Sequence, residues 1–405
     1  MTNDGPAMAD WTGSLRRSAL EEMLSTTARP RVVSLALGLP APDLFPSGVL
    51  GELLRHALAV DARALQYGPP SEELKGFVAR LMKRRGVDCG PDAVFLTAGA
   101  QQAMSLLARL LLEPGSPVIV ESSSYTGFHQ AVAPARARFV VVPSCTQAGI
   151  DLGAVERAMA SKPRPALLYA MSDGHNPTGV SLPAASRRRL AAMAREHRVP
   201  ILEDDAYGML SYDGEERPCL RAFDDEWVFY IGSFSKTLAP ALRTGWIVAP
   251  PRMVPLLSSL KESSDINTAT LGQRGVAAFA ASGRFDDHLA ALRKAYALRR
   301  DAMVAALVRE LPAGARWTIP RSGFFTWVEL PDGLDAGALL EQTLARENVA
   351  FLPGAAFAAP GASAVRSAMR LSFSNLTPEA IAGAVAGIGR VLASLAGGRP
   401  GEDQQ

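Results

Sequence analysis

The sequence predicts an α/β fold with a largely parallel sheet that is covered by helices on both faces. Two patterns between residues 90 and 250 indicate this class. Short runs of β-branched and other apolar residues occur there, and each run is apolar throughout. Helical patterns separate these runs. Strands that are buried on both faces, with crossover helices between them, are typical of parallel sheets.

Six strands are expected in this region, one from each apolar run. In chain order they cover 93–97, 117–121, 138–143, 165–171, 199–204 and 227–233. Two of the helices between them are expected over 101–113 and 186–198, because apolar residues recur there at three- and four-residue spacing. We therefore expect a mostly parallel sheet flanked by helices.

After residue 283 the pattern changes. One long helical stretch, 286–312, is followed by a helix and by strand-like segments at 324–331, 348–354 and 368–374. This alternation predicts a smaller α+β domain at the C-terminal end. The expected division is an N-terminal arm with part of the small domain (1–46), a large domain (47–285) and a small C-terminal domain (286–405).

Composition argues against several classes of function. The 405 residues carry a formal net charge of only +2 without a long block of one sign, which indicates neither nucleic acid nor an anionic membrane as partner. Cys89, Cys145 and Cys219 are widely spaced, so we expect neither a disulfide framework nor a metal site. The first residues do not resemble a signal peptide, and no membrane span is expected. A reducing cytoplasm is the simplest setting.

Polar residues follow several of the predicted strands, where ligands bind in doubly wound sheets. A small-residue turn that opens a helix at Ala100 and Gln101 suits a phosphate, although many tight turns look the same. Asp204 and Tyr207 follow strand 199–204, and Asn176 lies in a turn after strand 165–171. Each of these alone is more often an ordinary loop residue than part of a site.

Lys236 is one of only six lysines, and it follows strand 227–233 together with Ser233 and Ser235. Arg243 comes seven residues later. A lysine near a core usually extends its amine to water. A desolvated lysine near other cations instead has a lowered pKa and a nucleophilic amine, as Schiff-base chemistry requires.

Nine segments spread over nearly the whole chain now indicate a family. They are SLALGLPAPDLFP (34–46), LQYGPP (65–70), FLTAGAQQAMSLLARLLLEPGSPVIVESSSYTG (95–127), HNPTG (175–179), ILEDDAYGML (201–210), GSFSKTLAPALRTGWIVAP (232–250), SGFFTWVELP (322–331), FLPGAAF (351–357) and MRLSFS (369–374). In order and spacing they resemble the fold-type I pyridoxal phosphate enzymes, specifically class I/II aminotransferases such as the 2-aminoadipate and kynurenine aminotransferases. The resemblance implies that the mostly parallel sheet is of the seven-stranded type, and it makes 47–285 the cofactor-binding domain.

The resemblance assigns roles to the residues that would face the pyridine ring. It makes Lys236 the Schiff-base lysine and Asp204 the carboxylate that pairs with the pyridine nitrogen. Tyr207 and Asn176 would hydrogen-bond the phenolic oxygen of the cofactor, and Tyr125 would stack on its ring. Lys236, Asp204 and Tyr207 are therefore the expected catalytic residues.

The phosphate and substrate subsites follow from the same resemblance. The phosphate would be held by Ala100, Gln101, Ser233, Ser235 and Arg243. Arg370 resembles the arginine that grips the substrate α-carboxylate, with Gly38 and Asn176 in the same subsite. Tyr67 resembles a tyrosine that reaches the phosphate of the neighbouring subunit, which implies a homodimer with shared active sites.

The implied activity is transfer of the α-amino group of an L-amino acid to a 2-oxo acid, while Lys236 carries a proton. One alternative keeps pyridoxal phosphate but catalyses β- or γ-elimination, replacement, decarboxylation or oxidation. Another is a winged-helix regulator with an aminotransferase-like ligand domain. Two observations argue against a regulator: the resemblance starts near residue 30, and the net charge gives no support for DNA binding.

Three segments depart from the family pattern. Ser172-Asp173-Gly174 stands where relatives have a Pro-x-aromatic segment, Glu121–Tyr125 lacks a proline two residues before its tyrosine, and the segment 67–77 is short and carries Lys75 in place of arginine. We expect Asp173 to lie in solvent in a rebuilt loop. The alternative is that its charge meets a cationic or polar substrate group. These departures leave the identity of the substrate open.

Overall fold

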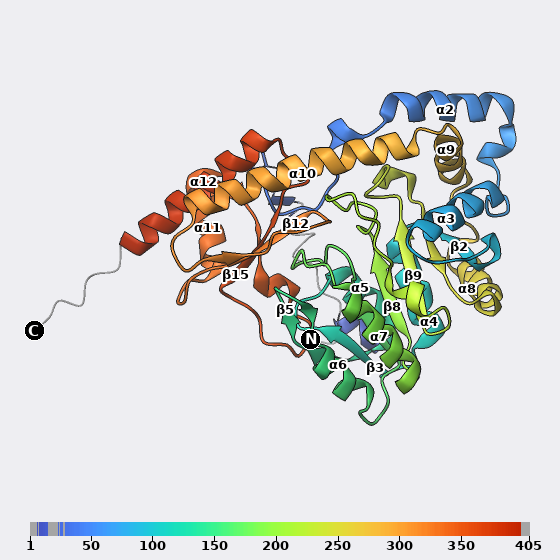
Figure 1. The fold of residues 1–405 in the computed structure, drawn as a ribbon, viewed down its shortest axis with the longest axis horizontal. Helices are drawn as coiled ribbons and strands as arrows, with labels where there is room; N and C mark the ends of the chain where they lie inside the picture. Colours follow the sequence, from blue (N-terminus) through green and yellow to red (C-terminus); the bar gives the residue numbers. More distant parts are fainter. Residues whose placement is uncertain (1–5, 7, 15–22, 24, 27–28, 398–405) are drawn as a thin grey trace, which may run out of the picture.

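The structure is a computed structural model that describes residues 6, 8–14, 23, 25–26 and 29–397. Within this part a seven-stranded sheet dominates (Figure 1). Its spatial order is β2 (Val94–Thr97), β10 (Gly245–Val248), β9 (Val228–Ser233), β8 (Ile201–Asp205), β7 (Leu167–Ala170), β3 (Pro117–Glu121) and β4 (Arg138–Val142). β10 is antiparallel to both of its neighbours, and the other neighbouring strands are parallel. The predicted α/β class is confirmed.

Each of the six expected strands is present in this sheet, with ends that differ by a few residues from the prediction. The strand that the apolar runs did not predict is β10. It has only four residues, Gly-Trp-Ile-Val, and a loop rather than a helix connects it to β9. Its place between β9 and β2 explains why Trp246 is buried.

Helices cover both faces of the sheet, as the continuous apolar strands require. In β3, Ile119 packs with α6 (Leu152–Met159) and α7 (Ala184–His197), whereas Val118 and Val120 on the opposite face pack with residues from several other helices. These are α3 (Glu72–Arg84), α4 (Ala100–Leu111), α5 (Thr126–Val132), α8 (Val254–Asp265) and α9 (Thr270–Ala281). α2 (Ser47–Val60) packs on α9.

The C-terminal part is built on a four-stranded antiparallel sheet in the order β11 (Arg316–Trp317), β12 (Phe325–Glu329), β15 (Ala368–Ser372) and β14 (Leu352–Pro353). α10 (Phe285–Glu310), α11 (Ala336–Glu347) and α12 (Pro378–Gly397) accompany it. Figure 1 shows the long α10 crossing from the side of α9 to that of α12. Its first half packs in the core of the large sheet and its second half in the C-terminal core, so α10 holds the two parts together.

The N-terminal segment joins the C-terminal part. β1 (Val33–Ser34) pairs in parallel with β13 (Val349–Ala350), and a hairpin of β5 (Ser144–Cys145) and β6 (Gly149–Ile150) completes the strands. The division at 46 and 285 stays a prediction, and its first segment lies partly outside the described residues.

Short 3-10 helices connect several of these elements. They are η1 (Asp10–Ser14), η2 (Pro42–Leu44), η3 (Ala62–Leu65), η4 (Pro91–Ala93), η5 (Ala133–Ala135), η6 (Leu220–Phe223), η7 (Pro240–Leu242), η8 (Pro251–Met253) and η9 (Gly354–Phe357).

Helix α12 is the one described helix that is long and apolar enough to cross a membrane. Its window Pro378–Leu395 has a mean hydropathy of 1.2, and 44% of it is buried inside the protein. α12 packs against α10 and α11, and Ile381, Val385 and Ile388 belong to the C-terminal core. Its apolar residues are therefore accounted for by packing within this chain.

Candidate functional site

A cavity of about 290 Å³ lies where β8 and β9 end, and it collects the polar residues that the sequence singled out. Twelve of the thirteen predicted site residues line it: Gly38, Ala100, Gln101, Tyr125, Asn176, Asp204, Tyr207, Ser233, Ser235, Lys236, Arg243 and Arg370. The thirteenth, Tyr67, does not line the cavity, and 71% of its surface is exposed. Residues from distant parts of the chain therefore meet at one site.

Lys236 lies at the cavity wall just beyond the end of β9. Its Nζ donates to the carbonyl oxygen of Gly38 at 3.0 Å and lies 5.8 Å from the centre of the Phe324 ring. Burial, assisted by the positive charge of Arg370 and opposed by Asp204, lowers the pKa of Lys236 to about 8. A substantial fraction of the amine is therefore neutral, and so nucleophilic, at mildly alkaline pH.

Gly38 lies so close to the Phe325 ring that a side chain at this position would clash with it. A Cβ at this position would lie 2.3 Å from Cζ of Phe325. The carbonyl group that accepts the Lys236 hydrogen bond thus depends on a residue without a side chain.

Asp204, near the end of β8, is a buried carboxylate with one unused acceptor. Its Oδ2 accepts a 2.8 Å hydrogen bond from the hydroxyl of Tyr169, while its Oδ1 is buried without a partner. Burial raises the pKa of Asp204 to about 6, although the Tyr169 hydrogen bond acts in the opposite direction. A buried acceptor without a partner is costly, so Oδ1 favours a ligand that donates a hydrogen bond.

The other end of the cavity suits an anion. α4 begins at Ala100, where the first N–H groups of the helix lack partners within it. Arg243 is held over this turn by a 2.9 Å hydrogen bond from Nη2 to the carbonyl of Ala98. Gly99 has φ +87°, and a Cβ there would lie 2.8 Å from Nη2 of Arg243, so the glycine leaves room for the guanidinium. Ser233 and Ser235, whose hydroxyls are 3.0 Å apart, complete this end of the cavity.

Arg370 on β15 is buried with no acidic partner among the residues that the structure describes. Its guanidinium carbon lies 4.0 Å from the centre of the Phe325 ring and 4.6 Å from that of Phe357. Nη1 donates to Oδ1 of Asn176 at 2.7 Å, and Nε has no partner. A buried guanidinium that is oriented but not neutralised is suited to binding a carboxylate.

Three further predicted residues form the walls between these groups. The Tyr207 ring makes an edge contact with Phe324, with centroids 5.2 Å apart. Burial raises the pKa of the Tyr207 phenol and raises that of Tyr125 to about 12, so both remain protonated at neutral pH. Gln101 donates from Nε2 to the carbonyl of Gly127 at 2.8 Å, which ties the start of α4 to α5.

Asp173 occupies neither position expected for it. It is 3% exposed, it is absent from the described cavity lining, and it lies between two buried arginines. Arg187 donates to both of its carboxylate oxygens at 2.7 and 2.8 Å, and Arg85 Nη2 donates to its Oδ2 at 2.5 Å. Arg85 also contacts Asp205 Oδ2 at 2.9 Å. Both the solvent position and the substrate contact are therefore wrong, because the partners of Asp173 come from elsewhere in the chain.

Replacing Asp173 with asparagine should destabilise the protein strongly. The change keeps the shape but leaves two buried guanidinium groups with one carboxylate fewer, which typically costs about 3–5 kcal/mol. The exposed Asp286, which pairs with the adjacent Arg84, provides a control. Asp286→Asn should cost less than about 1 kcal/mol. Urea unfolding of both variants measures the difference, and equal losses would contradict the role assigned to Asp173.

The same cluster predicts a loss of stability in acid. Burial would raise the pKa of Asp173, but Arg85 and Arg187 outweigh it and hold that pKa below the ordinary value of 3.8. A carboxyl whose pKa is lower in the folded state stabilises the protein above its unfolded pKa. This contribution is lost as the pH falls below about 4, and Asp173→Asn should lack that part of the pH dependence.

Two polar contacts near the cavity were not predicted. Tyr169 is buried, and its hydroxyl donates a hydrogen bond to Asp204. His175, to which the sequence gave no role, places Nε2 3.0 Å from Glu121 Oε2 and Nδ1 2.9 Å from the Thr178 hydroxyl. Only its place in the HNPTG segment could have drawn attention to it.

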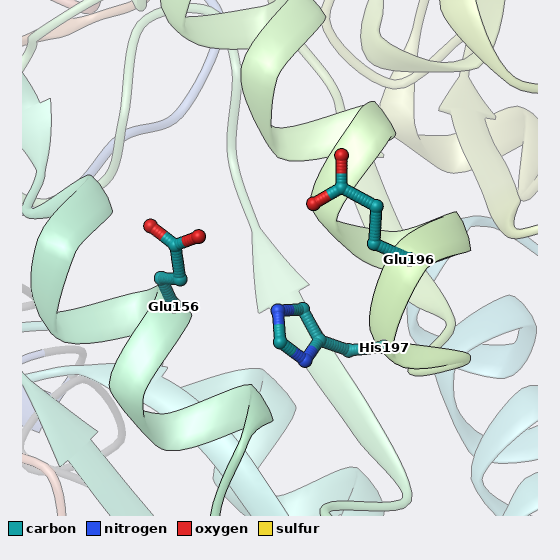
Figure 2. A group of neighbouring side chains, drawn as sticks. All are labelled: Glu156, Glu196 and His197. Atoms are coloured by element: carbon teal, nitrogen blue, oxygen red, sulfur yellow. The ribbon is translucent and has the colours of Figure 1, made fainter.

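A group of side chains that could bind a metal ion lies away from the cavity, on α6 and α7. Figure 2 shows Glu156, Glu196 and His197 directed toward one another. Arg189 already pairs with both carboxylates, at 2.6 Å from Glu156 and 3.0 Å from Glu196. We therefore assign no metal to this exposed group.

Fold and cavity together define a class of protein. A lysine, an unsatisfied carboxylate and an anion-binding helix end surround one cavity at the carboxyl edge of a mostly parallel sheet with this strand order. These are the features of a fold-type I pyridoxal phosphate enzyme.

Comparison with known proteins identifies the family. The model of the family "Aminotransferase class I and II" matches residues 41–388. A 2-aminoadipate transaminase of Thermus thermophilus is 39% identical over 96% of this chain and 97% of its own, and aromatic-amino-acid aminotransferase 1 of Thermococcus litoralis is 34% identical over 91% and 89%. The chain belongs to the class I and II aminotransferases.

Solved structures agree. The crystal structure of an α-aminoadipate aminotransferase of Thermus thermophilus, complexed with N-(5'-phosphopyridoxyl)-L-leucine, has a TM-score of 0.88 at 36% identity. The match covers 96% of this chain and 98% of that one. This protein is a pyridoxal phosphate-dependent aminotransferase, and the predicted family, activity and cofactor are confirmed.

The residues present fit this cofactor. The free Oδ1 of Asp204 can accept a hydrogen bond from a protonated ring nitrogen. The start of α4 and Arg243 can bind a phosphate, and the space beside Arg243 depends on the absence of a side chain at Gly99. Lys236 can reach the same cavity with its amine.

Proposed function

We propose that this aminotransferase uses Lys236 as the covalent attachment site and moves the α-amino group of an L-amino acid to a 2-oxo acid. The observation that supports this most is that Lys236, Asp204 and Arg370 line one cavity. When bound, pyridoxal phosphate supplies an electron sink for the pair released when the substrate Cα–H bond breaks. The described residues supply the binding, orientation and proton transfer.

Asp204 and the two tyrosines hold the ring in this proposal. Asp204 is the buried anion that keeps the ring nitrogen protonated, and Tyr207 and Asn176 donate hydrogen bonds to the phenolic oxygen. Tyr125 covers one face of the ring. Ala100, Gln101, Ser233, Ser235 and Arg243 bind the phosphate.

Arg370 orients the substrate. Its guanidinium plane is fixed by Phe325, Phe357 and Asn176, so a carboxylate can bind with two parallel hydrogen bonds in one orientation. Gly38 lines the same cavity, and the absence of a side chain there leaves room for the Phe325 ring on which Arg370 packs. Nζ of Lys236 then accepts the proton from the substrate Cα and returns a proton later, for which a pKa near neutrality is favourable.

A half-reaction tests this function. Purified holoenzyme is mixed with single amino acids in the absence of any 2-oxo acid, and the products are identified by mass spectrometry. Transamination predicts one equivalent of 2-oxo acid per site and conversion of the cofactor to pyridoxamine phosphate. Repeated turnover without an acceptor, with the cofactor unchanged, would contradict transamination and support elimination. The altered loop 172–174 gives elimination no support, because Asp173 contacts arginines rather than the cavity.

A homodimer is part of the proposal. Leu65, Tyr67 and Ile266 are exposed apolar residues on neighbouring segments, because Thr270 and Asn267 donate hydrogen bonds to the carbonyls of Gln66 and Gly68. Exposed apolar groups of this kind favour an interface. We place the second subunit here, with Tyr67 reaching the phosphate site of its partner.

Replacing Tyr67 with phenylalanine should therefore weaken cofactor binding although Tyr67 lies outside the cavity of its own chain. Loss of one hydrogen bond to a charged phosphate should raise the dissociation constant of pyridoxal phosphate by about tenfold. Titration of the apoenzyme with the cofactor measures this change. Sedimentation of the wild type and of Tyr67→Phe checks that both are dimers. A monomeric wild type with unchanged cofactor affinity would contradict the shared site.

We also propose a cytoplasmic location. None of the three cysteines forms a disulfide, and Cys145 is exposed, which suits a reducing compartment.

A further inference from the structure

Two adjacent carboxylates at the end of β8 are held by two tyrosines from the strands on either side. Tyr169 on β7 donates to Asp204 Oδ2 at 2.8 Å, and Tyr230 on β9 donates to Asp205 Oδ2 at 3.0 Å. All four residues are buried. Successive side chains of a strand point to opposite faces, so the two pairs lie on different sides of the sheet edge.

The two pairs have different surroundings. Asp205 is fully engaged: its Oδ2 also accepts from Arg85 at 2.9 Å, and its Oδ1 accepts from the backbone N–H of Gly208 at 2.6 Å. Asp204 lines the cavity, has Tyr169 as its only hydrogen-bond donor among the described residues, and keeps Oδ1 free. The Tyr169 bond therefore selects which oxygen of Asp204 remains available.

Tyr169 is itself rigidly held. Its ring stacks on Phe128 of α5, with centroids 4.0 Å apart and an interplanar angle of 9°. The hydroxyl is thus fixed by the packing of β7 and α5 rather than by the ligand. Tyr169 does not line the cavity, so it can act on a ligand only through Asp204.

We propose that Tyr169 is a positioning residue that fixes the Asp204 carboxylate by binding Oδ2, so that Oδ1 is presented to the pyridine nitrogen. The inference rests on the proposed role of Asp204. The donated hydrogen bond also favours the ionised carboxylate, which is the form that can pair with a protonated ring.

The groups that face Asp204 come from several elements, and they set the direction of the expected pH effect. They are Tyr169 on β7, Asp205 on β8, Lys236 after β9, His175 in the loop after β7, and the phenols of Tyr125 and Tyr207. Burial raises the pKa of Asp204, and the hydrogen bond from Tyr169 is the largest of the effects that lower it. Without that bond, Asp204 should protonate at higher pH.

Tyr169→Phe tests the inference, and Tyr230→Phe is its matched control. Each change removes one buried hydroxyl from a neighbouring carboxylate, and phenylalanine at 169 preserves the stack on Phe128. For Tyr169→Phe, the dissociation constant of pyridoxal phosphate, measured by titrating the apoenzyme, should rise by about tenfold. The pH below which the half-reaction becomes slower should rise by about one unit, because Asp204 then protonates at higher pH. Tyr230→Phe should change both by less than about twofold, because Arg85 and Gly208 still hold Asp205.

A double-mutant cycle separates failure of the inference from failure of the proposed function. In an Asp204→Asn background, Tyr169→Phe should add little to the dissociation constant, since its effect acts through the carboxylate. If Asp204→Asn itself leaves cofactor affinity unchanged, the role proposed for Asp204 is wrong. If Asp204→Asn weakens binding but Tyr169→Phe behaves like Tyr230→Phe, or adds its full effect without Asp204, the positioning role is overturned.

Discussion

Lys236→Ala should lower turnover by at least about 10³-fold, because general acid–base catalysis alone typically contributes about 10²–10⁴-fold and the variant also lacks the nucleophilic amine. Nζ is the lysine amine placed in the cavity, held by the carbonyl of Gly38 at 3.0 Å. Burial brings its pKa to about 8, so it can both accept and return a proton near neutral pH. Single-turnover rates with an amino acid substrate measure the loss.

Two controls show whether this loss is chemical. Lys236→Arg keeps the positive charge but carries a guanidinium that does not release its proton, so it should be almost as impaired as the alanine variant. Lys236→Ala should still bind pyridoxal phosphate, because Asp204 and Arg243 are unchanged. A small added amine should restore part of the rate by supplying a base in the vacated space. Turnover close to that of the wild type in Lys236→Ala would refute the assignment.

Arg370→Lys should lower kcat/KM for amino acids by about 10²–10⁴-fold. Two charge-assisted hydrogen bonds of about 1.5–3 kcal/mol each depend on the guanidinium fork, and lysine keeps the charge without the fork. The orientation of the fork is set by Phe325 and Phe357 on its faces and by Asn176 at Nη1. Loss of the carboxylate contacts weakens binding and also loosens the orientation of the substrate Cα. We therefore expect KM to rise and kcat to fall.

An amine without an α-carboxylate is the matched control for Arg370. Such a substrate cannot use the guanidinium, so wild type and Arg370→Lys should process it at similar, slow rates. A carboxylate inhibitor should also bind the variant more weakly. Equal losses for the amino acid and the simple amine would show that the substitution damages the site rather than carboxylate binding.

Much of the fold could be predicted because parallel strands buried on both faces are continuous apolar runs. Six strands of the large sheet correspond to such runs, and the long α10 corresponds to the helical stretch over 286–312. β10 was not predicted from its own residues, because four residues after an irregular loop carry little periodicity. Its antiparallel place between β9 and β2 is a tertiary property.

The site was predicted from the family resemblance more than from individual residues. Glycines, a lysine and an aspartate at strand ends are weak signals separately, yet the structure brings them to one cavity. What could not be predicted are contacts between distant segments. Asp173 accepts a hydrogen bond from Arg85, which lies 88 residues earlier in the chain. Tyr169 donates a hydrogen bond to Asp204 because the register between β7 and β8 places the two side chains together. Tyr67 stays a prediction, since its proposed target belongs to a second subunit.

Borohydride reduction of the holoenzyme, followed by peptide mapping with mass spectrometry, tests the central claim most directly. Reduction makes the bond between lysine and cofactor permanent without requiring any substrate. The expected result is a single phosphopyridoxyl-modified peptide that contains Lys236, and no modification of the Lys236→Ala variant at that segment. Modification chiefly at another of the six lysines, with Lys236 unmodified in active enzyme, would contradict the proposed site.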